Sequence, residues 1–331
     1  MKIAVDVMGG DLGPEPPIRG CVNFVRKTGL EVVIVGDEKI IDSVLSNEKQ
    51  VLDKIEIAHT TQFVNMDDRI SKVLRKKKLA SISIAARLVK SGYCKGLFTI
   101  GNTAAAISWS NIVLRKLKGV KKAALCSILP KLSGFTILVD SGASLRCTGD
   151  NLYQFAEMGN VIAGSFFKKK HPAIGLINIG KEEGKGKFKI QRANYLLKKS
   201  GLNYIGYIEG NDLVSGNVDV AVCDGFIGNV LLKYSEGIFK NFVKINPFKD
   251  LKNLLKNIPN TNMKNITRLN GAPLLGVMGT VIVGHGSSDE QEFENGLHLT
   301  SLFLQAEINN KLEKVFAKKK YFENLKGRED E

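Results

Sequence analysis

Short runs of β-branched and apolar residues recur along the chain, and most of them end at glycine or a small polar residue. The runs span residues 3–7, 31–35, 96–100, 135–139, 173–179 and 218–222. Stretches with apolar residues at helical spacing lie between them, as in 70–89 and 152–159. Strands that alternate with helices predict a mainly parallel sheet covered on both faces. We therefore expect one α/β domain over residues 1–331, with three layers around a mostly parallel, mixed sheet.

Glycines gather at the ends of the predicted strands. They are Gly9, Gly10, Gly101, Gly142, Gly180 and Gly225. In such sheets ligands bind beyond the carboxyl ends of the strands, where the loops converge. Backbone N–H groups without an obstructing side chain can point at an anion near a helix N-terminus. The placement of these glycines therefore predicts loops that bind a phosphate-like anion at one edge of the sheet.

Several standard motifs are missing from the chain. The turn at Gly9–Gly13 does not fit the dinucleotide pattern G-x-G-x-x-G, and neither G-x-x-x-x-G-K-[ST] nor G-x-S-x-G occurs. The five cysteines form no C-x-x-C pair, so the sequence indicates neither a zinc site nor a disulfide framework. We expect no metal and no nucleotide cofactor.

The chain is strongly basic, with 48 Lys and Arg against 33 Asp and Glu and a formal charge of +15. Such an excess predicts attraction to phosphate esters, nucleic acid, an anionic membrane or an acidic protein. Nucleic-acid binding has no support from a recognised module or from interleaved aromatic residues. The N-terminus lacks the apolar core of a secretory signal, and no apolar run approaches the roughly 20 residues that cross a bilayer. We expect a cytoplasmic protein without a membrane span.

The segment 232–270 departs from the alternation, because it has no strand signal and is rich in lysine. Asn246 followed by Pro247 is typical of a helix start. We predict a protruding hairpin of two helices. Six of its residues form an apolar stripe with flanking lysines: Phe248, Lys249, Leu251, Lys252, Leu254 and Leu255. This pattern is typical of a helix on a membrane surface, whereas a dimer interface with a wet basic face is the alternative. A further helix is expected over 301–325.

Sequence blocks along most of the chain match one family in order. They are 1–11 (MKIAVDVMGGD), 101–103, 140–143, 152–159, 175–180 with Glu182, Lys185 and Gly186, 208–210, 224–230 with Lys233, 276–277 and 285–286. Together they resemble the bacterial phosphate acyltransferases, which make acyl phosphate from acyl carrier protein for phospholipid synthesis. The departures from the family pattern are Ile100, Ala104, Ser141, Ser144 and Asn211.

The resemblance implies a fold of the isocitrate dehydrogenase and phosphotransacetylase type. It also implies a homodimer and transfer of a fatty acyl group from acyl carrier protein to inorganic phosphate. Peripheral attachment to an anionic membrane would follow from the hairpin, although the same lysines would suit an acidic carrier protein. The alternatives are an enzyme like phosphate acetyltransferase that uses acyl-coenzyme A, and a basic nucleic-acid-binding protein.

Phosphate is already an oxyanion at neutral pH, so this reaction needs no activated side-chain nucleophile. The predicted phosphate-binding residues are Gly9, Gly10, Gly101 and Gly142 through their amides, together with Asn102, Thr103 and Ser144. We predict that Lys185 neutralises phosphate, that Asn229 donates to the thioester carbonyl, and that His285 is the general acid to the departing thiolate. A covalent acyl-enzyme on Cys223 is the less favoured alternative, because its neighbours are apolar.

Overall fold

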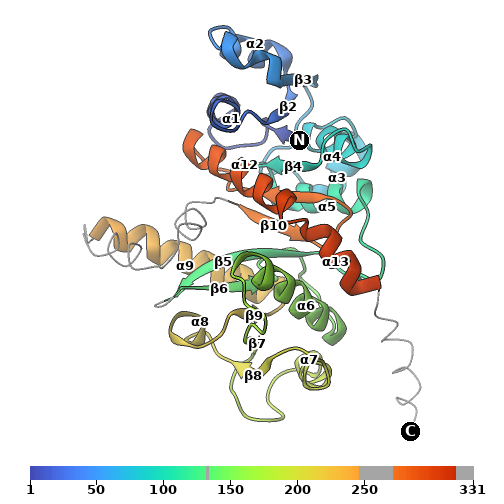
Figure 1. The fold of residues 1–331 in the computed structure, drawn as a ribbon, viewed down its shortest axis with the longest axis vertical. Coiled ribbons are helices and arrows are strands. Elements are labelled where there is room, and N and C mark those ends of the chain that lie inside the picture. The colour runs from blue at the N-terminus through green and yellow to red at the C-terminus, as the bar shows by residue number, and fades with distance from the viewer. Residues whose placement is uncertain (132–133, 246–270, 318–331) are drawn as a thin grey trace.

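The structure, a computed structural model, describes residues 1–131, 134–245 and 271–317 (Figure 1). Its centre is one sheet that confirms the predicted mixed, mostly parallel α/β fold. The strands lie in the order β3 (Ile55–His59), β2 (Glu31–Gly36), β1 (Lys2–Asp6), β4 (Gly96–Thr99), β11 (Thr280–Val283), β10 (Ala272–Leu275), β5 (Ala124–Lys131), β6 (Gly134–Val139), β9 (Val220–Val222), β7 (Ile174–Ile177) and β8 (Tyr204–Ile208).

The sheet contains two parallel groups of strands. The first group, β3-β2-β1-β4-β11, is joined to the second, β6-β9-β7-β8, through β10 and β5. Pairing is antiparallel between β11 and β10, between β10 and β5, and between β5 and β6. Three reversals make the two groups run in opposite directions. The carboxyl ends of the strands therefore do not form the single edge that the sequence predicted.

The helices that cover the sheet are shown in Figure 1. They are α1 (Glu15–Thr28), α2 (Glu38–Leu45), α3 (Ile70–Lys76), α4 (Ser81–Lys90), α5 (Thr103–Val113), α6 (Gly149–Phe166), α7 (Phe188–Lys198), α8 (Asp212–Ser215), α9 (Gly225–Ile245), α12 (Glu290–Gln305) and α13 (Ile308–Ala317), with a 3-10 turn at Lys49–Lys54. Two predicted helices are divided. The 70–89 stretch is interrupted between α3 and α4, and the 301–325 helix begins in α12 and breaks at Glu307, whose φ is 50°.

Alternating side chains of the strands enter different cores. In β1, Ile3 and Val5 join the core under α1 and α12, whereas Ala4 joins the core under α4 and α5. In β6, Ile137 packs with α6, and Leu138 packs with α8 and α9. Every one of these strand residues is fully buried, as expected for a sheet with helices on both faces. The result is the predicted three-layer arrangement.

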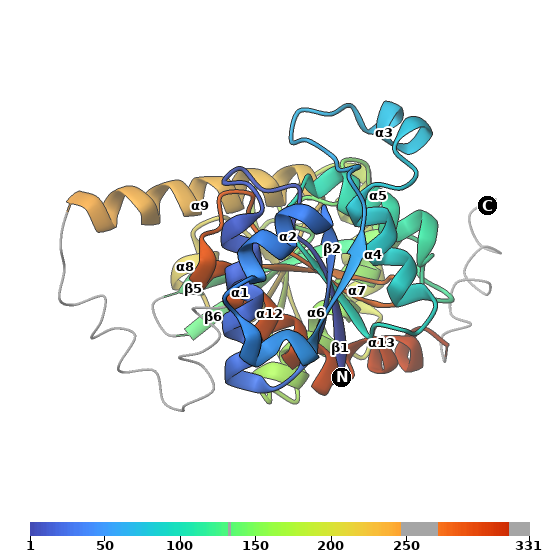
Figure 2. The ribbon, with the colours of Figure 1, turned by 90° about the horizontal axis from the view of Figure 1, so that it is seen from above.

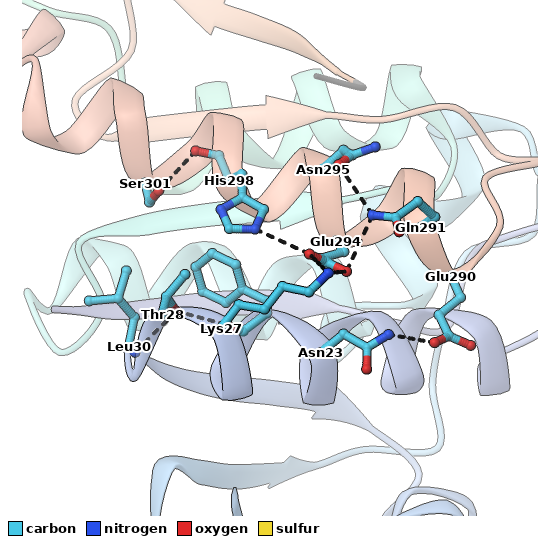
Figure 3. Close-up of polar contacts among 11 residues, drawn as sticks. Asn23, Lys27, Thr28, Leu30, Glu290, Gln291, Glu294, Asn295, His298 and Ser301 are labelled. Atoms are coloured by element: carbon cyan, nitrogen blue, oxygen red, sulfur yellow. Dashed lines mark hydrogen bonds and ion pairs between the residues drawn. The ribbon is translucent and has the colours of Figure 1, made fainter. Parts of the chain in front are cut away.

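A polar cluster joins α1 to α12 at one side of the first group (Figure 3). The carboxylate of Glu294, which is 3% exposed, accepts from Lys27 Nζ at 2.7 and 2.8 Å. His298 Nε2 lies 3.3 Å from the same carboxylate, and its ring packs edge-on against Phe24. Asn23 and Glu290 form a second link between the helices. These contacts fix α12, which follows the loop that carries His285.

α9 is the longest helix of the described chain, with 21 residues. Its first half packs on the second strand group through Ile227, Leu231 and Leu232. Figure 2 shows its far end extending beyond the neighbouring elements. Residues 232–245, predicted to begin a hairpin, belong to this helix, which starts earlier at Gly225. The rest of the predicted hairpin, 246–270, lies outside the described residues. The six residues predicted to touch membrane or carrier protein (248–255) lie outside the described residues. Among those described, no helix combines the length and the apolar character that crossing a membrane requires.

Candidate active site

Asp6 holds the loops that follow β1 and β4. Its carboxylate is 2% exposed, accepts from Thr99 Oγ1 at 2.9 Å, and accepts from the Met8 N–H at 3.3 Å. Thr99 Oγ1 in turn accepts from the Gly101 N–H at 3.1 Å. Burial raises the pKa of Asp6, and its hydrogen bonds act in the opposite direction. The Gly101 amide is therefore occupied, and not free to bind phosphate as predicted.

Glycines allow three loops of the first group to meet. A Cβ on Gly9 would lie 2.7 Å from Gly101 Cα, and one on Gly10 would lie 3.3 Å from the Gly286 carbonyl oxygen. The Asp11 N–H donates to that same oxygen at 2.8 Å. The loops after β1, β4 and β11 therefore contact one another through backbone.

The N-terminus of α5 opens at this meeting point. Asn102 caps the helix, because its Oδ1 accepts from the Ala105 N–H at 3.0 Å, and its Nδ2 donates to the Met66 carbonyl at 2.8 Å. Thr103 and Ala104 are exposed in the first turn, where helical N–H groups lack intrahelical partners. This turn is suited to an anion. The asparagine amide itself is engaged in holding the loop.

Two departures from the family pattern have a local explanation. Ala104 is exposed in the first turn of α5, where alanine fits a helix well. Ile100 is 1% exposed and fills the space beside two glycines. A Cβ on Gly10 would lie 2.6 Å from Ile100 Cδ1, and one on Gly284 would lie 2.9 Å from Ile100 Cγ2. The larger side chain is accommodated because these neighbours have none.

His285, in the loop after β11, lies beside Lys233 of α9, which follows β9 in the second strand group. His285 Nδ1 lies 2.9 Å from Ser287 Oγ and accepts from the Ser287 N–H at 3.3 Å. An accepting Nδ1 places the proton of the neutral ring on Nε2. Lys233 Nζ, from α9, lies 3.5 Å from that Nε2. The Lys233 ammonium and the His285 Nε2–H are therefore two neighbouring hydrogen-bond donors. Lys233 also forms an ion pair with Glu236 at 2.9 Å.

The loop after β6 is built around Asp140. This residue is fully buried, and its Oδ1 accepts from the N–H groups of Leu125, Gly142 and Ala143 at 2.8–3.0 Å. Its Oδ2 is buried and has no hydrogen-bond partner among the described residues. Burial raises the pKa of Asp140. The Gly142 amide is consequently occupied, which differs from the predicted phosphate cradle.

The predicted hydroxyl donor Ser144 is occupied as well. Its Oγ donates to the Ala123 carbonyl at 3.2 Å, and its carbonyl accepts from the Gly225 N–H at 2.9 Å. Gly142 lies close to Asn229 of α9, since a Cβ on Gly142 would be 3.7 Å from the Asn229 side chain. Asn229 is exposed on the first turns of α9, one helical turn before Lys233. Asn229 and Lys233 therefore lie one turn apart on α9, with Gly142 near the first and His285 near the second.

Lys185 does not join this set. Its ammonium pairs with Glu182 at 2.7 Å in the turn after β7, and Asn178 Nδ2 donates to its carbonyl at 3.1 Å. The cation beside His285 is Lys233, which the sequence analysis did not select. Its position just after the family block 224–230 was the feature of the sequence that could have identified it.

Sequence reasoning also missed Lys189, which pairs with the buried Asp224 at the start of α9. Asp224 Oδ1 accepts from the Ile227 N–H at 3.0 Å and so caps that helix.

The cysteines have no role in this arrangement. All five are buried, and burial raises the pKa of Cys126 to about 12 and that of Cys223 well above its usual value. A thiol that stays protonated is a poor nucleophile. Within the described ranges, no cluster of three His, Cys, Asp or Glu residues is arranged to hold a metal ion.

Comparisons with solved structures confirm the predicted phosphotransacetylase type of fold. The EutD phosphotransacetylase from Staphylococcus aureus aligns over 92% of this chain and 94% of its own, with a TM-score of 0.60 and 14% identity. A phosphotransacetylase from Streptococcus pyogenes gives the same coverage and TM-score with 17% identity. At this identity the likeness concerns the fold.

Sequence comparisons address the family. The family model described as "Fatty acid synthesis protein" matches residues 1–311. The phosphate acyltransferase of Lawsonia intracellularis is 39% identical over 327 residues, which cover 94% of this chain and 93% of that protein. The phosphate acyltransferase of Shewanella woodyi is 38% identical over 331 residues, with 95% and 96% covered. The chain therefore belongs to the fatty acid synthesis protein family, together with these bacterial phosphate acyltransferases.

Proposed function

We propose that this protein transfers a fatty acyl group from the thioester of acyl carrier protein to inorganic phosphate. The acyl phosphate formed would serve phospholipid synthesis. The observation that carries the proposal is the pair of donors at His285 and Lys233, 3.5 Å apart. Such a pair, next to the open N-terminus of α5 and the exposed Asn229, suits an anionic nucleophile beside an acyl group. Family membership supports the same reaction.

The reaction balances without a covalent enzyme intermediate. An oxygen of hydrogen phosphate attacks the thioester carbonyl carbon, and the tetrahedral intermediate collapses with cleavage of the carbon–sulfur bond. The proton of the hydrogen phosphate ends on the departing thiolate, so that acyl phosphate and a thiol are the products. In this proposal the Nε2 proton of His285 passes to the departing thiolate, and the proton that the phosphate loses replaces it on that nitrogen. Lys233 and the first turn of α5 hold the phosphate, and Asn229 donates to the carbonyl oxygen as it gains charge.

This activity is tested by supplying the purified protein with acyl-acyl carrier protein and inorganic phosphate. We expect thiol release that requires phosphate, with stoichiometric formation of acyl phosphate, detected as the hydroxamate. Acyl-coenzyme A is the matched donor, because a protein like phosphate acetyltransferase would prefer it. Salt-dependent binding to a DNA duplex without phosphate-dependent thiol release would contradict the proposal and favour a nucleic-acid-binding protein.

Lys233, in place of the predicted Lys185, is proposed as the cation that binds phosphate. We expect Lys233→Met to raise KM for phosphate about tenfold or more, because it removes a charge-assisted hydrogen bond. Lys185→Met is the matched control, since it removes one lysine of similar exposure from the same protein. Steady-state kinetics with varied phosphate measures both. A larger effect from Lys185→Met would return the phosphate-binding role to the loop after β7.

A homodimer through α9 is part of the proposal. Four large side chains at four-residue intervals form an exposed apolar stripe on this helix: Phe226, Val230, Tyr234 and Ile238, which are 64%, 55%, 68% and 41% exposed. The stripe is self-complementary if a second copy packs across a two-fold axis. A neighbouring copy would also cover the side of α9 that carries Asn229 and Lys233.

We expect Val230→Glu combined with Ile238→Glu to convert the dimer to monomer in sedimentation equilibrium, because each charge would be buried against its own copy. Val214→Glu is the control, since Val214 is 54% exposed on α8 and lies outside the stripe. A dimer that survives the double substitution would place the interface elsewhere.

Peripheral attachment through the apolar residues of 248–255 is also proposed, on the sequence pattern alone. Leu254→Glu combined with Leu255→Glu should release the protein from anionic vesicles in a flotation assay, because two charges cannot enter the acyl boundary. Leu12→Glu with Leu79→Glu is the matched control, as these leucines are 55% and 54% exposed on the first half of the chain. Equal release by both pairs, or none by the first, would contradict the proposal.

A further inference from the structure

A hollow of about 380 Å³ lies between the C-terminal half of α6, the loop that follows it, and α13. α13 packs against α6 here (Figure 1). The polar residues that line it are Asn160, Ser165, Lys168, Lys169, Lys170 and Lys311. None of its lining residues is acidic. Its volume falls within the range of small-molecule sites, about 300–1,000 Å³.

Three of the four lysines carry charges that the described residues do not neutralise. Lys169 pairs with Asp219 at 2.6 Å, and Lys131 approaches the same carboxylate oxygen at 3.6 Å. The other oxygen of Asp219 accepts from the Ala173 N–H at 2.9 Å, so this acid is already shared among several donors. Within the described part of the chain, no carboxylate lies at ion-pair distance from Lys168, Lys170 or Lys311.

A helix C-terminus attracts cations, and this accounts for part of the cluster. Lys168–Lys170 follow the last residue of α6 and complement its dipole. It does not account for Lys311, which belongs to a different helix and whose Nζ donates to Ser165 Oγ at 3.1 Å. Lysines from separate elements thus line one hollow, where a single anion would meet several ammonium groups at once.

We propose that this hollow binds a compact ligand with two or more adjacent phosphate groups. Lysine ammoniums are point charges that suit phosphate oxygens without fixing one orientation. The Ser165 hydroxyl and the Asn160 amide provide neutral donors within the same lining. An oligophosphate would place one phosphate between Lys168 and Lys170 and another at Lys311 and Ser165.

This site is separate from the proposed active site. α6 begins just after the Asp140–Ser144 loop, and its residues that line the hollow lie between Asn160 and Ser165. At 1.5 Å per residue, they are roughly 16–24 Å along the helix from its start. A ligand here would therefore bind at the same time as the substrates.

The test is calorimetric titration with pyrophosphate at constant ionic strength, on the full chain. We expect one saturable site that Lys168→Gln/Lys170→Gln/Lys311→Gln weakens about tenfold or more, because three cations are removed. Lys72→Gln/Lys76→Gln/Lys78→Gln is the matched control on exposed lysines of the first half, and it should change the affinity by less than about twofold. Equal weakening by both triples, or no saturable binding, would overturn the proposal.

Two further arms make the result specific. A nucleoside diphosphate that binds as tightly as pyrophosphate identifies the phosphate groups as the recognised part, and tighter binding identifies a nucleotide as the ligand. The variant Lys168→Gln/Lys170→Gln/Lys311→Gln should have the same KM for inorganic phosphate in acyl transfer as the unmodified protein. Because the titration does not use acyl transfer, its result can be read even if the proposed reaction is not found. If the triple variant does not fold, Lys170→Gln and Lys311→Gln are titrated singly. Unchanged affinity in both would likewise overturn the proposal.

Discussion

Two aspartates at the carboxyl ends of strands, Asp6 and Asp140, set the positions of the loops that form the site. A carboxylate removed from water needs donors around it, because an unpaired buried charge is very unfavourable. Asp140 Oδ1 obtains three N–H donors, two of them from the turn that follows it. Asp6 fixes Gly101 through Thr99. The same amides that could bind an anion are used to hold the scaffold, so the proposed mechanism assigns phosphate binding to the first turn of α5 and to side chains.

The reversal of strand direction gives α9 its importance. Because the two parallel groups run in opposite directions, their carboxyl-end loops do not converge on one edge. α9 starts at Gly225, beside the Asp140 loop, and Lys233 reaches His285 two turns later. Asp224 caps the start of α9 and pairs with Lys189. These two contacts hold the end of the helix that is nearer the proposed active site. The exposed stripe on the same helix links the proposed active site to the proposed dimer contact.

The sequence predicted the parts of the fold that local pattern encodes. Six strands with continuous apolar runs were predicted correctly, since buried parallel strands carry that pattern. β5 and β10 were missed, and each contains a proline, Pro130 and Pro273, which argues against a strand when read alone. These two strands create the reversal, so the division of the loops into two groups was not visible either. The β3 edge strand is short and only partly buried, which leaves a weak signal.

The site shows the same division between local and long-range information. Glycine turns and the Asn102 cap follow from residue type and spacing. Both lysines pair with an acid three residues away in the sequence. Only the fold shows that Lys233 also lies beside His285, 52 residues along the chain, whereas Lys185 does not. The net charge of +15 is likewise not spread evenly over the surface of the protein. In the loop after β7, Lys181 and Lys185 meet acids, whereas at the hollow between α6 and α13 three lysines meet none in the described structure. Attraction to anions is therefore a property of particular places on this molecule, and a calculation from net charge alone would assign it to the whole surface.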